Sequence, residues 1–258
     1  MIKKPNQRLL KVLQLMFESD YLTFEDLVLF FGSRGRASEY LAYMKKMNFI
    51  DEFLTNLVPS KAYCISKYGY DILKTKGLTR SDRKFVISDY NYMKFSHQQA
   101  CTKVRIIFEK HPRVKDFRPQ KVAVYLAKQA GKEVYTKGWK QFDAEMIVEK
   151  DNKEYIVGVE IELTQKSVES YAKRFLNIDT TRQDVEYVAW LCGSKTIIDA
   201  MLNVLKNMQM KVNASKHKFC LLDDFLSKWF QTEWLDVEGP LLFMSLESQQ
   251  ENNKELQH

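Results

Sequence analysis

The chain of 258 residues carries 40 Lys and Arg against 33 Asp and Glu, a net charge of +7 at neutral pH that favours a polyanionic partner. This length allows one large or two small domains, and 45% apolar residues are enough for a core. No apolar run approaches the roughly 18 residues of a membrane helix, the start lacks a signal-peptide pattern, and the four cysteines contain no CxxC pair. We therefore expect a cytoplasmic protein with reduced thiols, without membrane insertion, a zinc site or a disulfide framework.

The first 85 residues predict a winged helix-turn-helix domain. Three segments with apolar residues at helical spacing come first, and the second has an N-cap at Thr23, Asp26 three residues later and a stop at Gly32. Two short strands around a turn at Pro59-Ser60 and a final helix follow. The expected elements are helices at 6–19, 22–32 and 33–50, strands within 50–66 and a helix at 67–77.

This domain is expected to bind DNA. In a winged helix the third helix enters the major groove and its N-terminal residues meet base edges. Arg34 and Arg36 suit guanine edges or phosphates, and Lys61 near the tip of the hairpin suits a phosphate. Residues 1–90 hold 15 basic against 10 acidic residues, a surplus of +5. The candidate DNA contacts are Ser33, Arg34, Arg36, Ser38, Lys45 and Lys61. A winged helix that docks on protein instead is the alternative.

After a polar connector, residues 90–245 predict an α/β domain with a mixed sheet, so the whole chain belongs to the α+β class. Strands first in a meander, followed by crossovers through helices, imply helices on both faces of the sheet. The expected order is a helix at 92–112, strands at 121–128, 140–150 and 153–163, a helix at 164–178, a strand at 185–193, a helix at 195–209 and a strand at 217–225. The last residues, 246–258, are polar and acidic, and we expect them to form a disordered tail.

The strand at 153–163 raises the main chemical question. Glu160 and Glu162 point to the same face of an otherwise apolar strand, because residues i and i+2 share a face. Counting back across the turn at 150–153 places Asp143 near the level of Glu160. Such carboxylates repel each other, and a cation between them removes that cost. The sequence therefore predicts a site for Mg²⁺ or Mn²⁺ on Asp143, Glu160 and Glu162, suited to metal-assisted attack on a phosphodiester.

This arrangement resembles the PD-(D/E)XK nuclease superfamily, also called restriction-endonuclease-like. In that family an Asp begins one strand and an acid-x-Lys motif lies on the next, which corresponds here to Asp143 and Glu160. The chain departs from the pattern because Glu162 stands at the lysine position. Gln165, Lys166 and Lys173 are nearby candidates for the role of that lysine.

A wider resemblance covers nearly the whole chain. A winged helix followed by such a domain, with the pattern E-x-E-L-T-x-K-S and a downstream Tyr, is similar to the MobC relaxases of mobilisable plasmids and to plasmid replication-relaxation proteins. The residues that match are His97, Asp143, Glu160, Glu162, Lys166, Ser167 and Tyr171. The resemblance implies a catalytic set of Asp143, Glu160, Glu162, Lys166, Tyr171 and His97. It also implies nicking of a double-stranded and partly single-stranded transfer origin, with an accessory mobilisation protein and a coupling protein as partners.

Other interpretations remain open at this point. Glu162 in place of lysine favours a non-catalytic DNA-binding protein of plasmid replication or partition, and a transposon-type endonuclease is a third possibility. The glutamates could lie on a solvated strand face, His97 on an ordinary helix face, Tyr171 in simple packing, and Lys166 on the surface. None of the histidines 97, 111, 217 and 258 has the His-hydrophobe-His spacing of ordinary relaxases, which excludes their mechanism.

Overall fold

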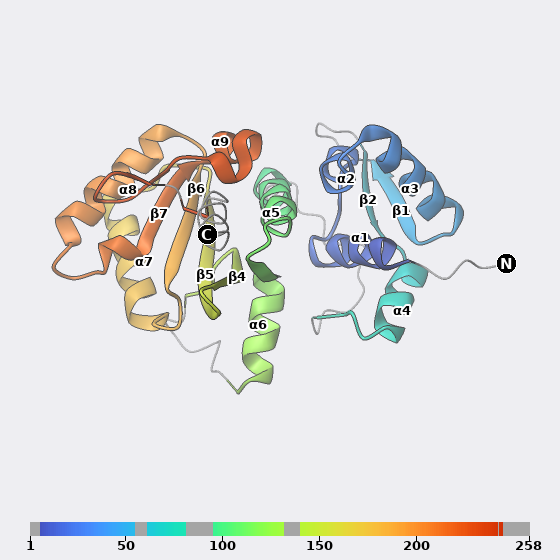
Figure 1. Ribbon diagram of the computed structural model, residues 1–258, viewed down its shortest axis with the longest axis horizontal. Coiled ribbons are helices and arrows are strands. Elements are labelled where there is room, and N and C mark those ends of the chain that lie inside the picture. Colours follow the sequence, from blue (N-terminus) through green and yellow to red (C-terminus); the bar gives the residue numbers. More distant parts are fainter. Residues whose placement is uncertain (1–5, 55–60, 81–94, 132–139, 242, 245–258) are drawn as a thin grey trace, which may run out of the picture. The chain divides into compact units, whose positions relative to one another are not determined.

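The computed structural model describes residues 6–54, 61–80, 95–131, 140–241 and 243–244 (Figure 1). They form two compact units. The first lies within residues 1–106 and 121–132, and the second within 107–120 and 133–258. The predicted turn at Pro59-Ser60 and the predicted tail at 246–258 lie outside the described residues.

The first unit begins with helices around a small hairpin, in the order expected from the sequence. Its elements are α1 (Gln7–Glu18), α2 (Phe24–Phe31), α3 (Arg34–Lys46), β1 (Ile50–Leu54), β2 (Lys61–Ile65) and α4 (Lys67–Thr75), followed by the larger part of α5 (Phe95–Phe108) and by most of α6 (Gln120–Gln129). The two strands pair antiparallel. Leu13, Leu27, Phe31, Met44 and Ile65 belong to one buried apolar core.

Local capping fixes the turn between α2 and α3. Thr23 and Asp26 form a complete capping box at the start of α2. Gly32 ends that helix in the left-handed conformation at φ 78°, which glycine adopts without strain. The Ser33 side chain then accepts a hydrogen bond from the Arg36 amide and starts α3. The boundary between the two helices therefore follows directly from four residues of the sequence.

Helix α5 packs with the first unit, whereas the sequence suggested a boundary between residues 85 and 90. The rings of Tyr21 and Phe95 stack with centroids 5.2 Å apart. Arg105 reaches the carboxylate of Glu18 at 2.7 Å, and Arg80 joins it at 3.0 Å. Burial by itself would raise the pKa of Glu18, but the two guanidinium groups outweigh it and hold this pKa below its usual value.

The second unit contains a seven-stranded mixed sheet. Its spatial order is β3-β4-β5-β6-β7-β8-β9, antiparallel from β3 to β5, parallel from β5 to β7 and antiparallel again to β9. The strands are β3 (Val114–Pro119), β4 (Ala144–Lys150), β5 (Lys153–Glu162), β6 (Tyr187–Cys192), β7 (His217–Leu221), β8 (Trp234–Leu235) and β9 (Pro240–Leu241). This arrangement confirms the predicted mixed sheet with interleaved helices.

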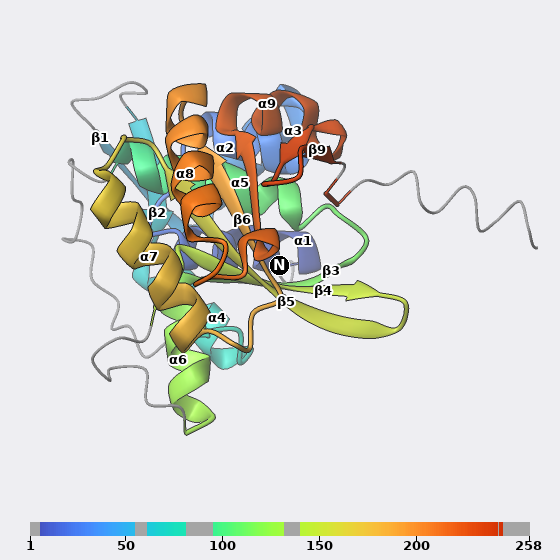
Figure 2. The same cartoon turned by 90° about the vertical axis from the view of Figure 1, so that its left-hand side faces the viewer.

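Three helices accompany these strands: α7 (Val168–Thr181), α8 (Lys195–Met208) and α9 (Leu222–Lys228). Helices α7 and α8 lie together in front of the sheet in Figure 2 and share a core with β6 that includes Phe175, Trp190 and Met201. Helix α9 packs against β6 and β7, and its Phe225 contacts Phe108 with ring centroids 4.7 Å apart.

The prediction of a strand at 121–128 is wrong. This segment is helical as part of α6, and the strand that precedes it in the sheet is β3 at 114–119. Val122, Val124 and Leu126 alternate as in a strand, but Val122, Ala123 and Leu126 also fit a helical face. Only Val122 and Ala123 of this segment are fully buried, which agrees with the helical pattern.

The four cysteines are free thiols in contrasting surroundings. Cys64, Cys192 and Cys220 are buried, whereas Cys101 on α5 is partly exposed. Burial raises the pKa of Cys64 to about 11 and that of Cys192 to about 12, and it raises the pKa of Cys220 well above its ordinary value. None of the described helices is long and apolar enough to cross a membrane.

Candidate functional site

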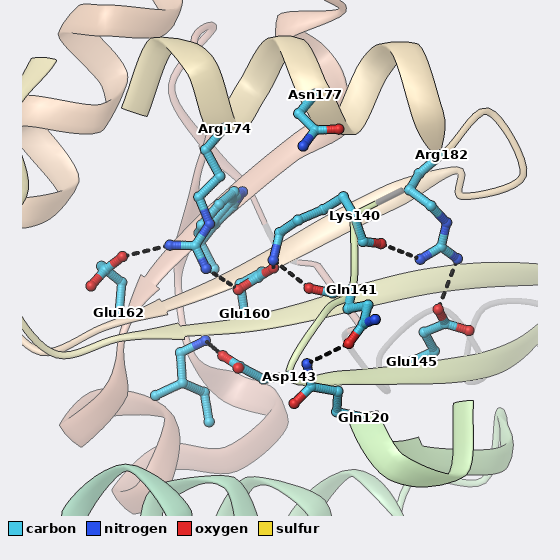
Figure 3. A network of polar contacts seen from close by, with 12 residues as sticks. Gln120, Lys140, Gln141, Asp143, Glu145, Glu160, Glu162, Arg174, Asn177 and Arg182 are labelled. Carbon is cyan, nitrogen blue, oxygen red and sulfur yellow. Dashed lines mark hydrogen bonds and ion pairs between the residues drawn. The ribbon is translucent and has the colours of Figure 1, made fainter. Parts of the chain in front are cut away.

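The hairpin of β4 and β5 brings Asp143 beside Glu160. The strands are joined by a tight turn in which Asp151 and Asn152 both have positive φ. Ala144 pairs with Val159, so Asp143 falls opposite Glu160, as the sequence predicted. The Asp143 side chain accepts a hydrogen bond of 2.8 Å from the Ile161 amide, which fixes its direction (Figure 3).

Glu160 is the most buried of these carboxylates, with no exposed surface. Burial raises its pKa above the ordinary value, and the charge of Asp143 adds to this, while Lys140 and Arg174 oppose it. Oε1 of Glu160 lies 2.5 Å from Nζ of Lys140, but no hydrogen bond of good geometry reaches this oxygen. The short separation makes this an ion pair, so each oxygen of Glu160 faces a cation, Lys140 at Oε1 and Arg174 at Oε2.

The cation between the two glutamates is the guanidinium of Arg174 on α7. One of its nitrogens lies 2.7 Å from Oε2 of Glu162, and another is bound to Oε2 of Glu160 (Figure 3). The group also lies over the Trp190 ring, 5.0 Å from its centroid. Burial would lower the pKa of Arg174, but the two glutamates outweigh this and raise it. The sequence pattern called for a cation here, and a side chain supplies it.

Two lysines complete the charge balance. Lys140 reaches Glu160, and the ammonium of Lys166 is bound to Glu162. Among the described residues named here, three cations thus stand beside the three carboxylates Asp143, Glu160 and Glu162. The Lys166 side chain is 40% exposed, against 17% for Lys140 and 20% for Arg174. Lys166 is thus the most accessible of the three cations.

A second ion cluster supports the first. Arg182 is buried and binds Glu145 at 2.8 Å and Asp184 at 2.9 Å. It also donates a hydrogen bond of 3.1 Å to the carbonyl of Lys140, which anchors the backbone beside the site (Figure 3). Its guanidinium lies over the ring of Phe142, 4.8 Å from the centroid. The segment that leads into Asp143 is therefore held in place by Arg182, which directly follows α7.

Asp143 and Glu160 face each other across the hairpin, whereas Glu162 lies at the end of β5 beside Arg174 and Lys166. Mg²⁺ commonly takes one or two protein carboxylates together with water and substrate phosphate. Asp143 and Glu160 are such a pair, and a metal ion there would compete with Lys140 and Arg174 for the oxygens of Glu160. Glu162 binds Arg174 and Lys166 through the same oxygen. Consistent with this, the described residues contain no group of three or more His, Cys, Asp or Glu placed to hold a metal. Glu162 as a metal ligand thus stays a prediction, and in the structure its carboxylate is paired with Arg174 and Lys166.

The structure places the other predicted catalytic residues in separate surroundings. Tyr171 is 1% exposed, its hydroxyl accepts a hydrogen bond of 3.0 Å from the Lys166 amide, and burial raises its pKa. A buried phenol in this position holds the Lys166 segment in place. Ser167 caps the start of α7. His97 lies on α5 in the first unit, where its Nδ1 is 3.6 Å from Sγ of Cys101.

The predicted DNA contacts all belong to the first unit. Arg34, Arg36 and Ser38 are exposed along the first turns of α3, and Arg34 pairs with Glu25 at 3.2 Å. The role of Ser33 is to cap the helix. Lys45 and Lys61 lie together because both bind Glu52 on β1, at 3.1 Å for Lys61.

Sequence reasoning missed Arg174, Lys140 and Arg182. A usable signal existed for Arg174, since it follows Tyr171 by three positions and thus shares the inner side of α7. Comparison of the chain with protein-family models, curated proteins and solved structures gave no match.

Proposed function

We propose that the protein binds double-stranded DNA through its first unit and cuts one strand with its second unit, as a nicking endonuclease of the relaxase type. The proposed substrate is a plasmid transfer origin that is partly single-stranded, and the proposed partners are an accessory mobilisation protein and a coupling protein in the cytoplasm. The first unit then acts as a winged helix-turn-helix, and the second as a PD-(D/E)XK-like nuclease.

The exposed side of α3 supports the DNA-binding part of this proposal. Gly35, Ser38 and Ala42 are exposed and follow one another at helical spacing. Their small side chains allow close approach to a groove floor, and no atom lies within 4 Å of a Cβ built on Gly35. Arg34 and Arg36 are exposed at the same end of the helix and are suited to base edges or phosphates.

The cleavage part rests on one observation: Asp143 and the fully buried Glu160 meet at the same level of two paired strands, so that two carboxylates lie together. These two side chains would hold a single Mg²⁺ or Mn²⁺, which when bound supplies an activated oxygen nucleophile and charge stabilisation. Lys140 balances Glu160 from within the site. Lys166, whose side chain is 40% exposed, is suited to a phosphate oxygen.

A specific observation also favours a second function. Three cationic side chains already lie beside the carboxylates of the site, so the fold does not need a metal ion to offset their repulsion. In the second candidate function, the protein binds plasmid DNA in replication or partition without cutting it, and the second unit is a scaffold.

A nicking assay separates the two functions. Supercoiled DNA carrying the cognate origin is incubated with the protein and Mg²⁺ or Mn²⁺, and the open circular product is measured. We expect nicking by the wild type, and a loss of at least about 100-fold in Asp143→Asn and Glu160→Gln with DNA binding retained. Glu154→Gln is the matched control, because Glu154 lies exposed on the same strand and should leave the rate unchanged. Metal-independent binding without nicking in the wild type would establish the second function.

DNA binding itself is tested on α3. If Arg36 contacts a base, Arg36→Ala should weaken binding to the specific sequence by about 1–3 kcal/mol. If Arg36 contacts a phosphate instead, the affinity should fall to a similar extent on all DNA sequences. Lys74→Ala on α4 removes the same charge from another exposed helix and should change affinity much less. Equal losses in the two variants would show that only overall charge matters.

A further inference from the structure

We propose that Arg174 takes the place of a second metal ion, so that the site accepts one divalent ion at Asp143 and Glu160 and none between Glu160 and Glu162. The part concerning the first ion rests on the proposed function. The part concerning Arg174 is independent of it and follows from the contacts of this side chain.

The position of Arg174 is that of a bridging cation. Side chains at i and i+2 of a strand stand side by side on one face, and here both are carboxylates. Two nitrogens of one guanidinium bind one oxygen of each. A metal ion that bridged Oε2 of the two carboxylates would have to displace this guanidinium, and one that used Oε1 of Glu160 would have to displace Lys140.

The guanidinium is also difficult to remove. It keeps its charge at any ordinary pH, since arginine is not deprotonated in proteins. Trp190 lies beneath it with no exposed surface, so the cation rests on a rigid ring. Lys166 differs, because its ammonium is more exposed and contacts Glu162 alone among the two glutamates. Arg174 is therefore a built-in part of the site, and Glu162 serves as its counter-charge.

The experiment counts bound metal ions. Mn²⁺ is titrated into full-length wild-type protein without DNA, and free Mn²⁺ is measured by electron paramagnetic resonance. The variants are Arg174→Gln, Glu162→Gln and the double variant Arg174→Gln/Glu162→Gln. Lys206→Gln is the matched control, because it removes one positive charge from an exposed position on α8.

We expect Arg174→Gln to bind one more Mn²⁺ than the wild type, and the double variant to lose this additional ion. Mn²⁺ should also raise the melting temperature of Arg174→Gln more than that of the wild type, because the ion replaces the missing charge. The control should match the wild type. Equal numbers of ions in Arg174→Gln and the wild type would overturn the proposal.

Glu162→Gln provides a test that does not depend on the folding of the arginine variant. Its amide oxygen can still accept hydrogen bonds from Arg174 and Lys166. We expect it to bind Mn²⁺ as the wild type does, and a loss of affinity of about tenfold or more would show that Glu162 is a metal ligand and overturn the proposal. If the wild type binds no Mn²⁺ and does not nick DNA, the proposed cleavage fails, but an ion gained by Arg174→Gln still supports the role of Arg174.

Discussion

At the scale of single residues, Glu18 ties the helices of the first unit together. Its pKa lies below the unfolded value because Arg105 and Arg80 outweigh the effect of burial. The ion pairs therefore contribute stability above the unfolded pKa of about 4.3 and lose it as the pH falls through the lower folded pKa. The contribution should be present at pH 7 and decline as the pH falls below about 4.

Glu18→Gln tests this contribution. It leaves Arg105 buried beside a neutral group, and we expect a loss of about 3 kcal/mol in the free energy of unfolding at pH 7. The difference from the wild type should shrink as the pH falls, in urea unfolding followed by circular dichroism. Glu25→Gln, in an exposed pair, should cost less than about 1 kcal/mol at any pH. A difference for Glu18→Gln that is independent of pH would contradict an ionic origin.

At the scale of elements, β5 passes close to the ring of Phe142 at Gly158. A Cβ added at Gly158 would lie 2.8 Å from the ring of Phe142, the residue that precedes Asp143. We expect Gly158→Ala to displace this ring, to cost about 1–3 kcal/mol of stability and to reduce nicking by moving Asp143. Gly35→Ala on α3 is the comparison, because its new methyl group meets no atom within 4 Å and should not destabilise the fold. Full nicking by Gly158→Ala would show that Asp143 does not depend on this packing.

Some secondary-structure elements could be predicted from the sequence and others could not. The hairpin around 150–153 was predictable, because alternation and a two-residue turn define the register, and the register alone places Asp143 opposite Glu160. The helix at 120–129 was not, because Val122, Ala123, Val124 and Leu126 satisfy both periods and tertiary packing decides. The pairing of Arg174 with the two glutamates depends on how α7 packs on β5, which local pattern does not specify.

At the scale of the whole molecule, the extent of the first unit determines where a fragment that contains it should end. A fragment of residues 1–85 keeps Glu18 and Tyr21 but loses Arg105 and Phe95, which contact them. We expect a fragment of residues 1–110 to melt about 10 °C or more above the shorter one, since a broken buried pair costs several kcal/mol. Both fragments should bind DNA with strong salt dependence if α3 carries the contacts. Equal melting temperatures would mean that α5 adds nothing to the stability of this unit.

The four thiols differ in burial, so their alkylation can report which part of the fold has opened. Alkylating reagents attack the thiolate, and the raised pKa values of Cys64, Cys192 and Cys220 leave almost none of it at neutral pH. A short pulse of iodoacetamide on the folded protein should therefore add one label, at the partly exposed Cys101, as seen by mass spectrometry. Each further label would show that a particular core has opened. Cys64 reports on the first unit, and Cys192 and Cys220 report on the second. A fluorophore attached to Cys101 would likewise mark α5 without any engineered cysteine.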